Sequence, residues 1–274
     1  MSNITASEVN KLRKATGAGM MDCKNALVEA KGDFELAIEN LRKKGQKVAA
    51  KRADRDSSEG AVIAMVNDNQ TKGVIISLNC ETDFVAKNES FVDLAKSFCK
   101  IALNCSSLDE LLNSTHDSMT VSEKLIEQTG VIGEKLEIGA FESVSSEHVG
   151  FYIHSGNKIA TLAGLSNKFE NVSDVSKNVA MQVAAMNPIA LNEDSVSKEI
   201  IEKEIEIAKE QLRAEGKPEA MLDNIANGKL KKFFKDNTLV KQAYIKDNKS
   251  SVENYIQSEN NECVITDFKR VALV

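Results

Sequence analysis

Apolar side chains recur every three or four positions through the N-terminal part of the chain, in three short runs that glycines separate. This spacing is typical of the buried face of a helix. The first run starts at Thr5 and Glu8, which fit a capping box, in which hydroxyl and carboxylate each bind a backbone N–H that the helix leaves free. Gly17 ends this run, and Gly32 separates the second run from the third. The pattern predicts a small three-helix module, which we place with its basic tail at residues 1–55.

The periodicity then changes to runs of branched apolar residues, which are typical of strands. Residues 60–66 and 73–78 flank a polar turn and predict a β-hairpin, and a helix with an apolar stripe follows. The same order recurs in outline from residues 150–165 onward. Two copies of a hairpin with a helix predict paired subdomains that each lay helices on one face of an antiparallel sheet. The expected fold class is therefore α+β, with one subdomain at 56–145 and the other at 146–274.

Within the second subdomain, residues 196–235 have a purely helical pattern. The apolar positions of its first half fall on one side of a helix: Ile201, Ile205, Ala208 and Leu212. Pro218 suits the first turn of a second helix. This predicts a helical hairpin, which either packs on its own domain or projects to meet another chain, and the pattern favours neither. The end of the chain predicts a short helix at 252–256 and a strand at 263–265.

The amino-acid composition of the chain argues against several classes of function. Of the 274 residues, 42% are hydrophobic and 28% charged, as in soluble, helix-rich proteins. Lys and Arg number 35 against 41 Asp and Glu, a net charge of −6, so the molecule lacks the positive field that sequence-independent binding to nucleic acid requires. No window has the apolar run of a signal peptide or a membrane span. We expect a cytoplasmic protein with no membrane partner and no specific nucleic acid.

The sequence offers little for catalysis. Its three histidines have no second ligand at metal-binding spacing, and it contains no glycine-rich phosphate loop and no nucleophile elbow. The five cysteines are scattered and lack a C-x-x-C pair, which is typical of reduced and buried thiols. We therefore expect no cofactor, no metal site, no catalytic residue and no enzymatic activity. An enzyme that acts through Cys80 or Cys99 is the least favoured alternative.

Two stretches combine residues that a plain helical core does not need. In residues 12–24, a predicted loop between short helices carries adjacent methionines, which occur both at protein-binding surfaces and in small cores. In residues 79–87, Thr82 fits a helix N-cap, and Asp83 suits the positive end of a helix. Both stretches are candidates for contact with another protein.

The position of Phe84 in the helical pattern favours burial. It lies seven and fourteen residues before Phe91 and Phe98, so on one continuous helix the three rings would share a face. From this spacing alone we expect Phe84 to be a core residue rather than an exposed one.

Together these stretches resemble the elongation factor Ts family, the nucleotide exchange factors of bacterial translation. The resemblance covers nearly the whole chain in order, and it rests on residues 12–24 (LRKATGAGMMDCK), 32–38 (GDFELAI), 79–87 (NCETDFVAK) and 180–188 (AMQVAAMNP). The first and third segments are long and specific. The chain departs from the family pattern in residues 100–145 and in the last fifty residues, where the usual Gln-Pro-Phe is Gln242-Ala243-Tyr244.

This resemblance implies a fold and a function. The three-helix module would be a ubiquitin-associated-like domain that binds the nucleotide-binding domain of elongation factor Tu, with a second contact through the core. The protruding hairpin at 196–235 mediates dimerisation in some members, which implies a possible homodimer or 2:2 complex. The chain would be a guanine nucleotide exchange factor that binds elongation factor Tu–GDP, displaces Mg²⁺ and promotes GDP release so that GTP can bind.

The resemblance also implies which residues act. Thr82, Asp83, Phe84 and Val85 match the segment that enters beside the partner's magnesium site. This reverses the expectation of a buried Phe84, because the family uses that ring as a wedge between partner helices. The residues that match partner-binding positions are Leu12, Thr16, Gly17, Met20, Met21 and His154.

A second class of function stays open. Residues 42–55 hold seven basic side chains, and such a run can contact RNA, which would make the chain an RNA- or ribosome-binding adaptor. The segment lacks the interleaved aromatic residues on which bases stack, so a solvated helix tail or linker is the favoured interpretation.

Overall fold

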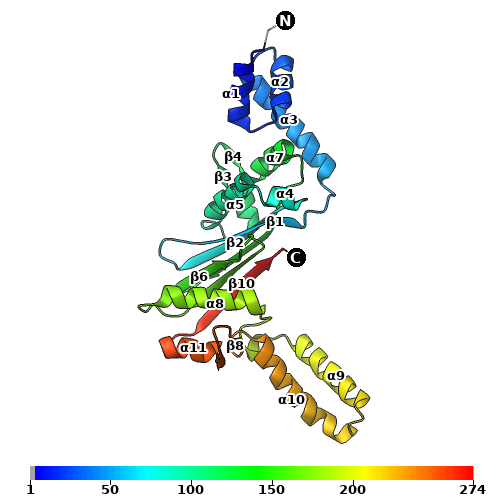
Figure 1. Cartoon of the computed structure of the whole chain (residues 1–274), viewed down its shortest axis with the longest axis vertical. Coiled ribbons are helices and arrows are strands. Elements are labelled where there is room, and N and C mark those ends of the chain that lie inside the picture. Colours follow the sequence, from blue (N-terminus) through cyan, green and yellow to red (C-terminus); the bar gives the residue numbers. More distant parts are fainter. Residues whose placement is uncertain (1–3, 274) are drawn as a thin grey trace.

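The computed structural model describes residues 4–273, so the outermost residues of the two expected end domains, 1–3 and 274, lie outside it. The molecule is elongated, with a helical module at one end, two sheets in the middle and a helical hairpin projecting at the other end (Figure 1). The expected α+β class is confirmed. In the described part of the chain, no helix is long and apolar enough to cross a membrane.

The N-terminal module consists of α1 (Ala6–Thr16), α2 (Met20–Glu29) and α3 (Phe34–Arg52). The predicted capping box at Thr5 is present, and Gly17 ends α1 in the left-handed conformation, with φ of 70°. A small core of buried residues holds the three helices together: Val9, Leu12, Ala18, Cys23, Ala26, Leu27, Ala30 and Ala37. The basic segment expected as a helix tail or linker continues α3 as far as Arg52. The adjacent methionines, expected in a loop, lie instead in the first turn of α2.

The first sheet has the strand order β1-β2-β5, and all neighbours in it are antiparallel. Its strands are β1 (Glu59–Val66), β2 (Lys72–Cys80) and β5 (Glu137–Ser145). One face carries α5 (Glu89–Ala102), α6 (Leu108–Asn113) and α7 (Val121–Ile132), with a small hairpin of β3 (Thr115–His116) and β4 (Met119–Thr120) beside them. The hairpin expected from residues 60–66 and 73–78 is confirmed.

The second sheet repeats this arrangement, with the order β10-β7-β6. It consists of β6 (His148–Ile153), β7 (Ile159–Leu165) and β10 (Ile265–Ala272), and α8 (Val172–Met186) covers one face. The inner faces of the two sheets pack on each other through Val62, Ala64, Ile75, Val144, Val149, Ala160 and Leu162. The strand expected at 263–265 begins only at Ile265, because the chain is still turning at Cys263, whose N–H donates to the Asn260 carbonyl.

The helical hairpin follows a short 3₁₀ turn, η1 (Glu193–Ser195), and consists of α9 (Lys198–Ala214) and α10 (Glu219–Asn237). The helical hairpin predicted at 196–235 is confirmed. Its apolar residues pack within the chain, with Leu212 against Leu222 and Ala226 toward the tip and Ile201 against Phe234 at the base. The chain then forms β8 (Ala243–Tyr244), β9 (Asp247–Ser251) and α11 (Val252–Glu259) before β10.

Candidate functional site

The segment after β2 forms a single helical turn, α4 (Asp83–Ala86), that presents an aromatic ring to solvent. Thr82 is its N-cap, and its hydroxyl accepts the N–H of Val85 at 3.5 Å. Ala86 is buried and Val85 packs against the core of the first sheet, whereas Phe84 between them is 83% exposed. We call residues 82–86 the Phe84 turn.

The expectation from helical phase, that Phe84 shares a buried face with Phe91 and Phe98, is wrong. The two later rings are buried, with exposures of 2% and 0%. A second cap separates them from Phe84, because the side chain of Asn88 accepts the N–H of Ser90 and starts α5 anew. The interruption between the two helices changes the phase, so the ring that would lie in the core on one continuous helix points outward.

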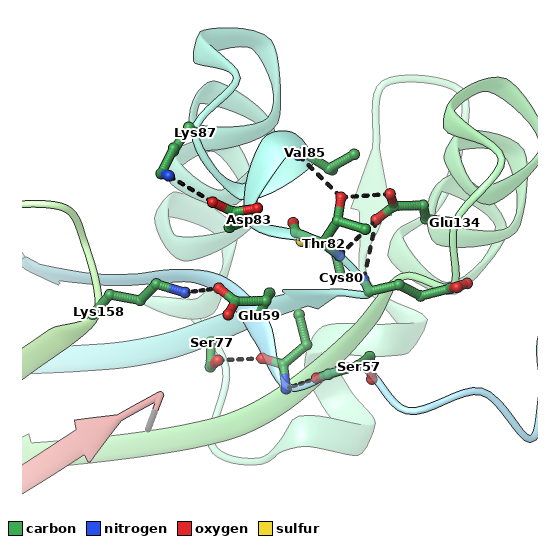
Figure 2. Close-up of polar contacts among 12 residues, drawn as sticks. Ser57, Glu59, Ser77, Cys80, Thr82, Asp83, Val85, Lys87, Glu134 and Lys158 are labelled. Carbon is green, nitrogen blue, oxygen red and sulfur yellow. Dashed lines mark hydrogen bonds and ion pairs between the residues drawn. The ribbon is translucent and has the colours of Figure 1, made fainter.

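A glutamate from another part of the fold holds the start of the Phe84 turn (Figure 2). Glu134 follows Gly133, which ends α7 with φ of 82°. One carboxylate oxygen, Oε1, accepts the Thr82 hydroxyl at 2.6 Å. The other, Oε2, accepts the backbone N–H groups of Thr82 at 3.0 Å and Glu81 at 3.1 Å. Three donors at the entry to α4 are thus satisfied by one side chain that lies 52 positions away from Thr82 in sequence.

Glu81, whose N–H binds Glu134, in turn accepts a hydrogen bond from the segment that carries Glu134. Its Oε1 accepts the N–H of Lys135 at 2.6 Å, and a guanidinium nitrogen of Arg52, the last residue of α3, lies 2.7 and 2.8 Å from its two oxygens. Burial would raise the pKa of Glu81, but the Lys135 amide and the Arg52 guanidinium outweigh it and hold that pKa below its usual value. The end of α3, the end of β2 and the α7–β5 connection therefore meet at one joint.

Asp83 and Lys87 form an exposed ion pair across the Phe84 turn, with 2.6 Å between Oδ2 and Nζ. The hydrogen bond from Lys87 lowers the pKa of Asp83, so the carboxylate is charged at neutral pH. A negative side chain near the start of a helix is favourable. The exposed pair leaves the carboxylate accessible to a partner.

The structure separates a second exposed surface from the Phe84 turn. Met20 and Met21, 52% and 63% exposed, lie at the start of α2, where the next residue, Asp22, pairs with Lys44 of α3. Beside them Gly17 is exposed and Thr16 is half-buried, with its hydroxyl bonded to the Leu12 carbonyl at 2.8 Å. Leu12 was expected on this surface, but it is completely buried, so it supports the surface from within and has no exposed side chain to offer a partner.

His154 is exposed, and it lies in the turn between β6 and β7. Its Nδ1 is 3.1 Å from the Tyr152 hydroxyl. In the same turn Lys158 pairs with Glu59 at the start of β1, and Glu59 lies opposite Cys80 in the first sheet. This turn and the Phe84 turn therefore border the same end of β1, as Figure 2 shows for Lys158 and Asp83.

The two cysteines weighed as nucleophiles, Cys80 and Cys99, lack the environment that a nucleophile needs. Cys80 and Cys99 are fully buried, and burial raises the pKa of each thiol to about 12, so neither has the thiolate character of a nucleophile. Within residues 4–273, no three His, Cys, Asp or Glu side chains are grouped as a metal site requires. What the segment does offer is an apolar ring on a short, well-anchored turn.

Comparison with known proteins identifies the family. The model of the family described as elongation factor TS matches residues 81–273, a range that starts at the joint and includes the Phe84 turn. Proteins named elongation factor Ts from Christiangramia forsetii and Flavobacterium psychrophilum are 66% and 63% identical over 273 residues, covering 100% of both chains. The protein of that name from Amoebophilus asiaticus is 51% identical and covers 98% of each chain. The chain belongs to the elongation factor Ts family.

As a member of the elongation factor Ts family, the chain is a translation elongation factor. The full-length relatives also cover the N-terminal module, which lies before the matched range of the family model. The sequence reasoning found the Phe84 turn, but it missed Glu134, Glu81 and Arg52. The only local signal for Glu134 was its place after Gly133, a glycine at a helix end.

The basic segment at the end of α3 carries acidic partners. Lys43 pairs with Glu39, Lys44 with Asp22, and Arg52 with Glu81. These pairs reduce the positive field of the segment. The structure therefore gives no specific support to the alternative of an RNA-binding adaptor.

Proposed function

We propose that this chain is a guanine nucleotide exchange factor for elongation factor Tu. It binds the GDP complex, displaces Mg²⁺ and promotes release of GDP so that GTP can bind. Membership of the elongation factor Ts family supports this proposal, and the single observation that carries it is the 83% exposure of Phe84 on an anchored turn. An exposed ring of this kind gains apolar burial only when another molecule covers it.

The exchange needs no bond to be made or broken. A protein that binds the nucleotide-free partner more tightly than the GDP-bound partner weakens GDP binding by the same factor. Mg²⁺ is the main counter-charge of the nucleotide phosphates in such a site, so moving the elements that hold it releases the nucleotide. In this proposal Thr82, Asp83, Phe84 and Val85 enter beside the partner's magnesium site.

The size of the effect can be estimated from Phe84. Burial of one such side chain contributes about 1.5–3 kcal/mol, and about 2 kcal/mol corresponds to roughly thirtyfold in an equilibrium constant. The remainder of the coupling comes from other contacts. We assign these to Met20 and Met21 on the N-terminal module, and to the core near His154.

The test is dissociation of labelled GDP from elongation factor Tu with and without the purified chain. We expect a rate that rises with the concentration of the chain and then saturates, since exchange proceeds through a complex. Release at the spontaneous rate at all concentrations would contradict the proposal. Binding of labelled tRNA at two salt concentrations is the matching assay for the adaptor alternative, which requires tight, salt-sensitive binding.

Self-association through the helical hairpin is a further part of the proposal. Ile201, Ile205 and Leu212, on the apolar side of α9, pack inside the hairpin, so a contact between chains would use the exposed Ile207 and Met221. Sedimentation velocity over a range of concentrations tests this. We expect a dimer that the Met221→Lys variant weakens, and a monomer at all concentrations would contradict it.

A further inference from the structure

Within residues 4–273, little of the chain packs against the ring of Phe84. It is 83% exposed, and the helix that carries it, α4, has four residues. A helix this short has little stability of its own, because nucleation is costly and only a few backbone hydrogen bonds offset it. The direction of the ring therefore depends on what fixes the backbone of the Phe84 turn.

Two sets of contacts fix that backbone. On the inner side, Val85 and Ala86 pack against the core of the first sheet. At the entry, the Glu134 carboxylate accepts three hydrogen bonds, from the N–H groups of Glu81 and Thr82 and from the Thr82 hydroxyl, at 2.6–3.1 Å. Packing keeps the turn on the sheet, whereas the hydrogen bonds set the angle at which the chain leaves β2.

The two connections are tied to each other in both directions. Glu134 accepts from the backbone beside Glu81, and the Glu81 carboxylate accepts the N–H of Lys135, which follows Glu134. Arg52 closes the joint from α3 by pairing with Glu81. Charge-assisted hydrogen bonds of this kind are the strong ones, and their fixed geometry restricts both segments at once.

We propose that Glu134 is a positioning residue for nucleotide exchange, whose carboxylate fixes the Phe84 turn in the orientation in which the ring enters the partner. This inference rests on the proposed function. Preorganisation is the physical reason, because a turn that is ordered before binding does not lose conformational entropy in the complex. This role requires no contact between Glu134 and the nucleotide or its metal.

The variants follow from the geometry of the three donors. Glu134→Ala removes all three acceptor contacts. Glu134→Gln keeps two of them, since its carbonyl oxygen replaces Oε2 toward the two N–H groups, and it reverses the third, since its amide donates to the oxygen of the Thr82 hydroxyl. Geometry rather than charge therefore decides the outcome, and the Gln variant is the conservative rescue.

The matched control is Glu123→Ala, at the other end of α7. Glu123 completes a capping box, in which its Oε2 accepts the N–H of Thr120 at 2.8 Å and the Thr120 hydroxyl at 3.2 Å. The control thus removes a glutamate with similar contacts at the opposite end of α7 without touching the joint. Any loss that arises only from weakening α7 affects both alanine variants alike.

The experiment measures labelled-GDP release from elongation factor Tu at increasing concentrations of each full-length variant. For Glu134→Ala we expect the maximal rate to fall by at least about tenfold, with the half-saturating concentration changed by less than about threefold, because the methionines of the N-terminal module still bind. Glu134→Gln and Glu123→Ala stay within about threefold of the wild type. In the free chain, hydrogen exchange at the Glu81 and Thr82 amides is faster by at least about tenfold only in Glu134→Ala.

The outcomes separate the two proposals. If the wild type accelerates release but Glu134→Ala matches Glu123→Ala, the positioning role is wrong and the exchange function stands. A Gln variant as slow as the Ala variant also overturns the positioning role, since the retained contacts would then be irrelevant. If the wild type does not accelerate release at all, the proposed function and this inference both fail.

Discussion

An exposed phenylalanine in a folded protein leaves its apolar surface in water unless a partner covers it. Phe84 stands out in this respect because its neighbours Val85 and Ala86 are packed in the core while the ring itself is 83% exposed. The fold thus fixes the backbone of the Phe84 turn, whereas the ring of Phe84 adds nothing to the stability of the fold. That division of roles makes the contribution of the ring to binding separable from its contribution to folding.

Replacing Phe84 by alanine is therefore expected to slow GDP release with little effect on stability. We expect the accelerated rate to fall by roughly thirtyfold, because truncating an aromatic residue at the centre of an interface costs about 2 kcal/mol or more. The melting temperature stays within about 2 °C of the wild type, since surface substitutions are usually within about 0.5 kcal/mol. Val264→Ala, at another exposed apolar residue, serves as the control and leaves the rate unchanged. A fall of several degrees in the melting temperature of Phe84→Ala would instead show that the ring contributes to folding as a core residue does.

His148 gives the fold a dependence on pH. It is 3% exposed, and its Nε2 lies 3.1 Å from the Ser176 hydroxyl. Burial, with a smaller effect from the charge of Lys168, lowers its pKa, so folding favours the neutral imidazole. The unfolded chain takes up that proton below its ordinary pKa of about 6.5. Stability from this group is therefore complete above that pH and is lost as the pH falls toward the lower pKa of the folded state.

Urea unfolding at pH 7.5 and pH 5.5 tests this dependence. We expect the wild type to lose more stability across this interval than His148→Gln, which retains a polar partner for Ser176 but does not titrate. His116 and His154 are present in both proteins, so their contributions cancel. Equal losses in the two proteins would show that His148 does not set the dependence.

At the scale of the elements, the crossing of α3 on α7 determines where the N-terminal module sits. Gly45 and Gly130 face each other at this crossing, and a Cβ on Gly130 would lie 2.4 Å from the Gly45 Cα. Inside a helix, glycine destabilises by about 1 kcal/mol relative to alanine. The close approach of the two helix backbones is the reason that glycine is nevertheless favourable at positions 45 and 130. No larger residue fits without moving one helix.

We expect Gly130→Ala to displace α3 and loosen the module. Limited proteolysis with trypsin should cut the basic end of α3 faster than in the wild type, and binding to elongation factor Tu should weaken. Gly228→Ala in α10 is the matched control, because a Cβ at this position would meet no atom within 4 Å outside its own part of the helix backbone. There the substitution should stabilise by about 0.5–1 kcal/mol. If Gly130→Ala resists trypsin as well as the wild type does, the crossing of α3 on α7 does not determine the position of the module.

Local sequence patterns predicted most helices and strands but not the contacts that connect segments far apart in the sequence. The hairpins, the paired sheets and the helical hairpin follow from spacings within a few residues, and these were confirmed. Phe84 was misplaced by phase because the caps at Thr82 and Asn88 break a stripe that looks continuous in sequence. Family resemblance corrected its role. Glu134 and Arg52 could not be found this way, since their partners lie 52 and 29 positions away and only the fold brings them together.

For the whole molecule, the distance between the two exposed surfaces matters. Met20 and Met21 lie on the N-terminal module and Phe84 on the core, and α3 connects them as a single helix that ends at Arg52. Two surfaces on one rigid body bind the same partner with higher affinity than either alone, because the second contact becomes intramolecular. The module is therefore expected to contribute mainly to affinity.

Deleting residues 1–55 tests this division. We expect the half-saturating concentration for GDP release to rise by at least about tenfold, as the loss of one of two linked contacts implies. The remaining chain keeps the circular dichroism spectrum of a folded protein and loses only the helical signal of α1, α2 and α3, because both sheets and their helices lie in residues 59–272. Loss of ordered structure in the shortened chain would instead show that the module is needed for folding.

The helical hairpin leaves and rejoins the core at adjacent points. Ala190 and Thr238 form a bridge, and the N–H of Leu239 donates to the Ala190 carbonyl at 2.9 Å. Helices α9 and α10 thus form an insertion whose two ends lie so close together that a tight turn could connect them. An insertion with neighbouring ends can lengthen, shorten or disappear during evolution without altering the register of either sheet. Related chains are therefore freest to diverge in length at this part of the molecule.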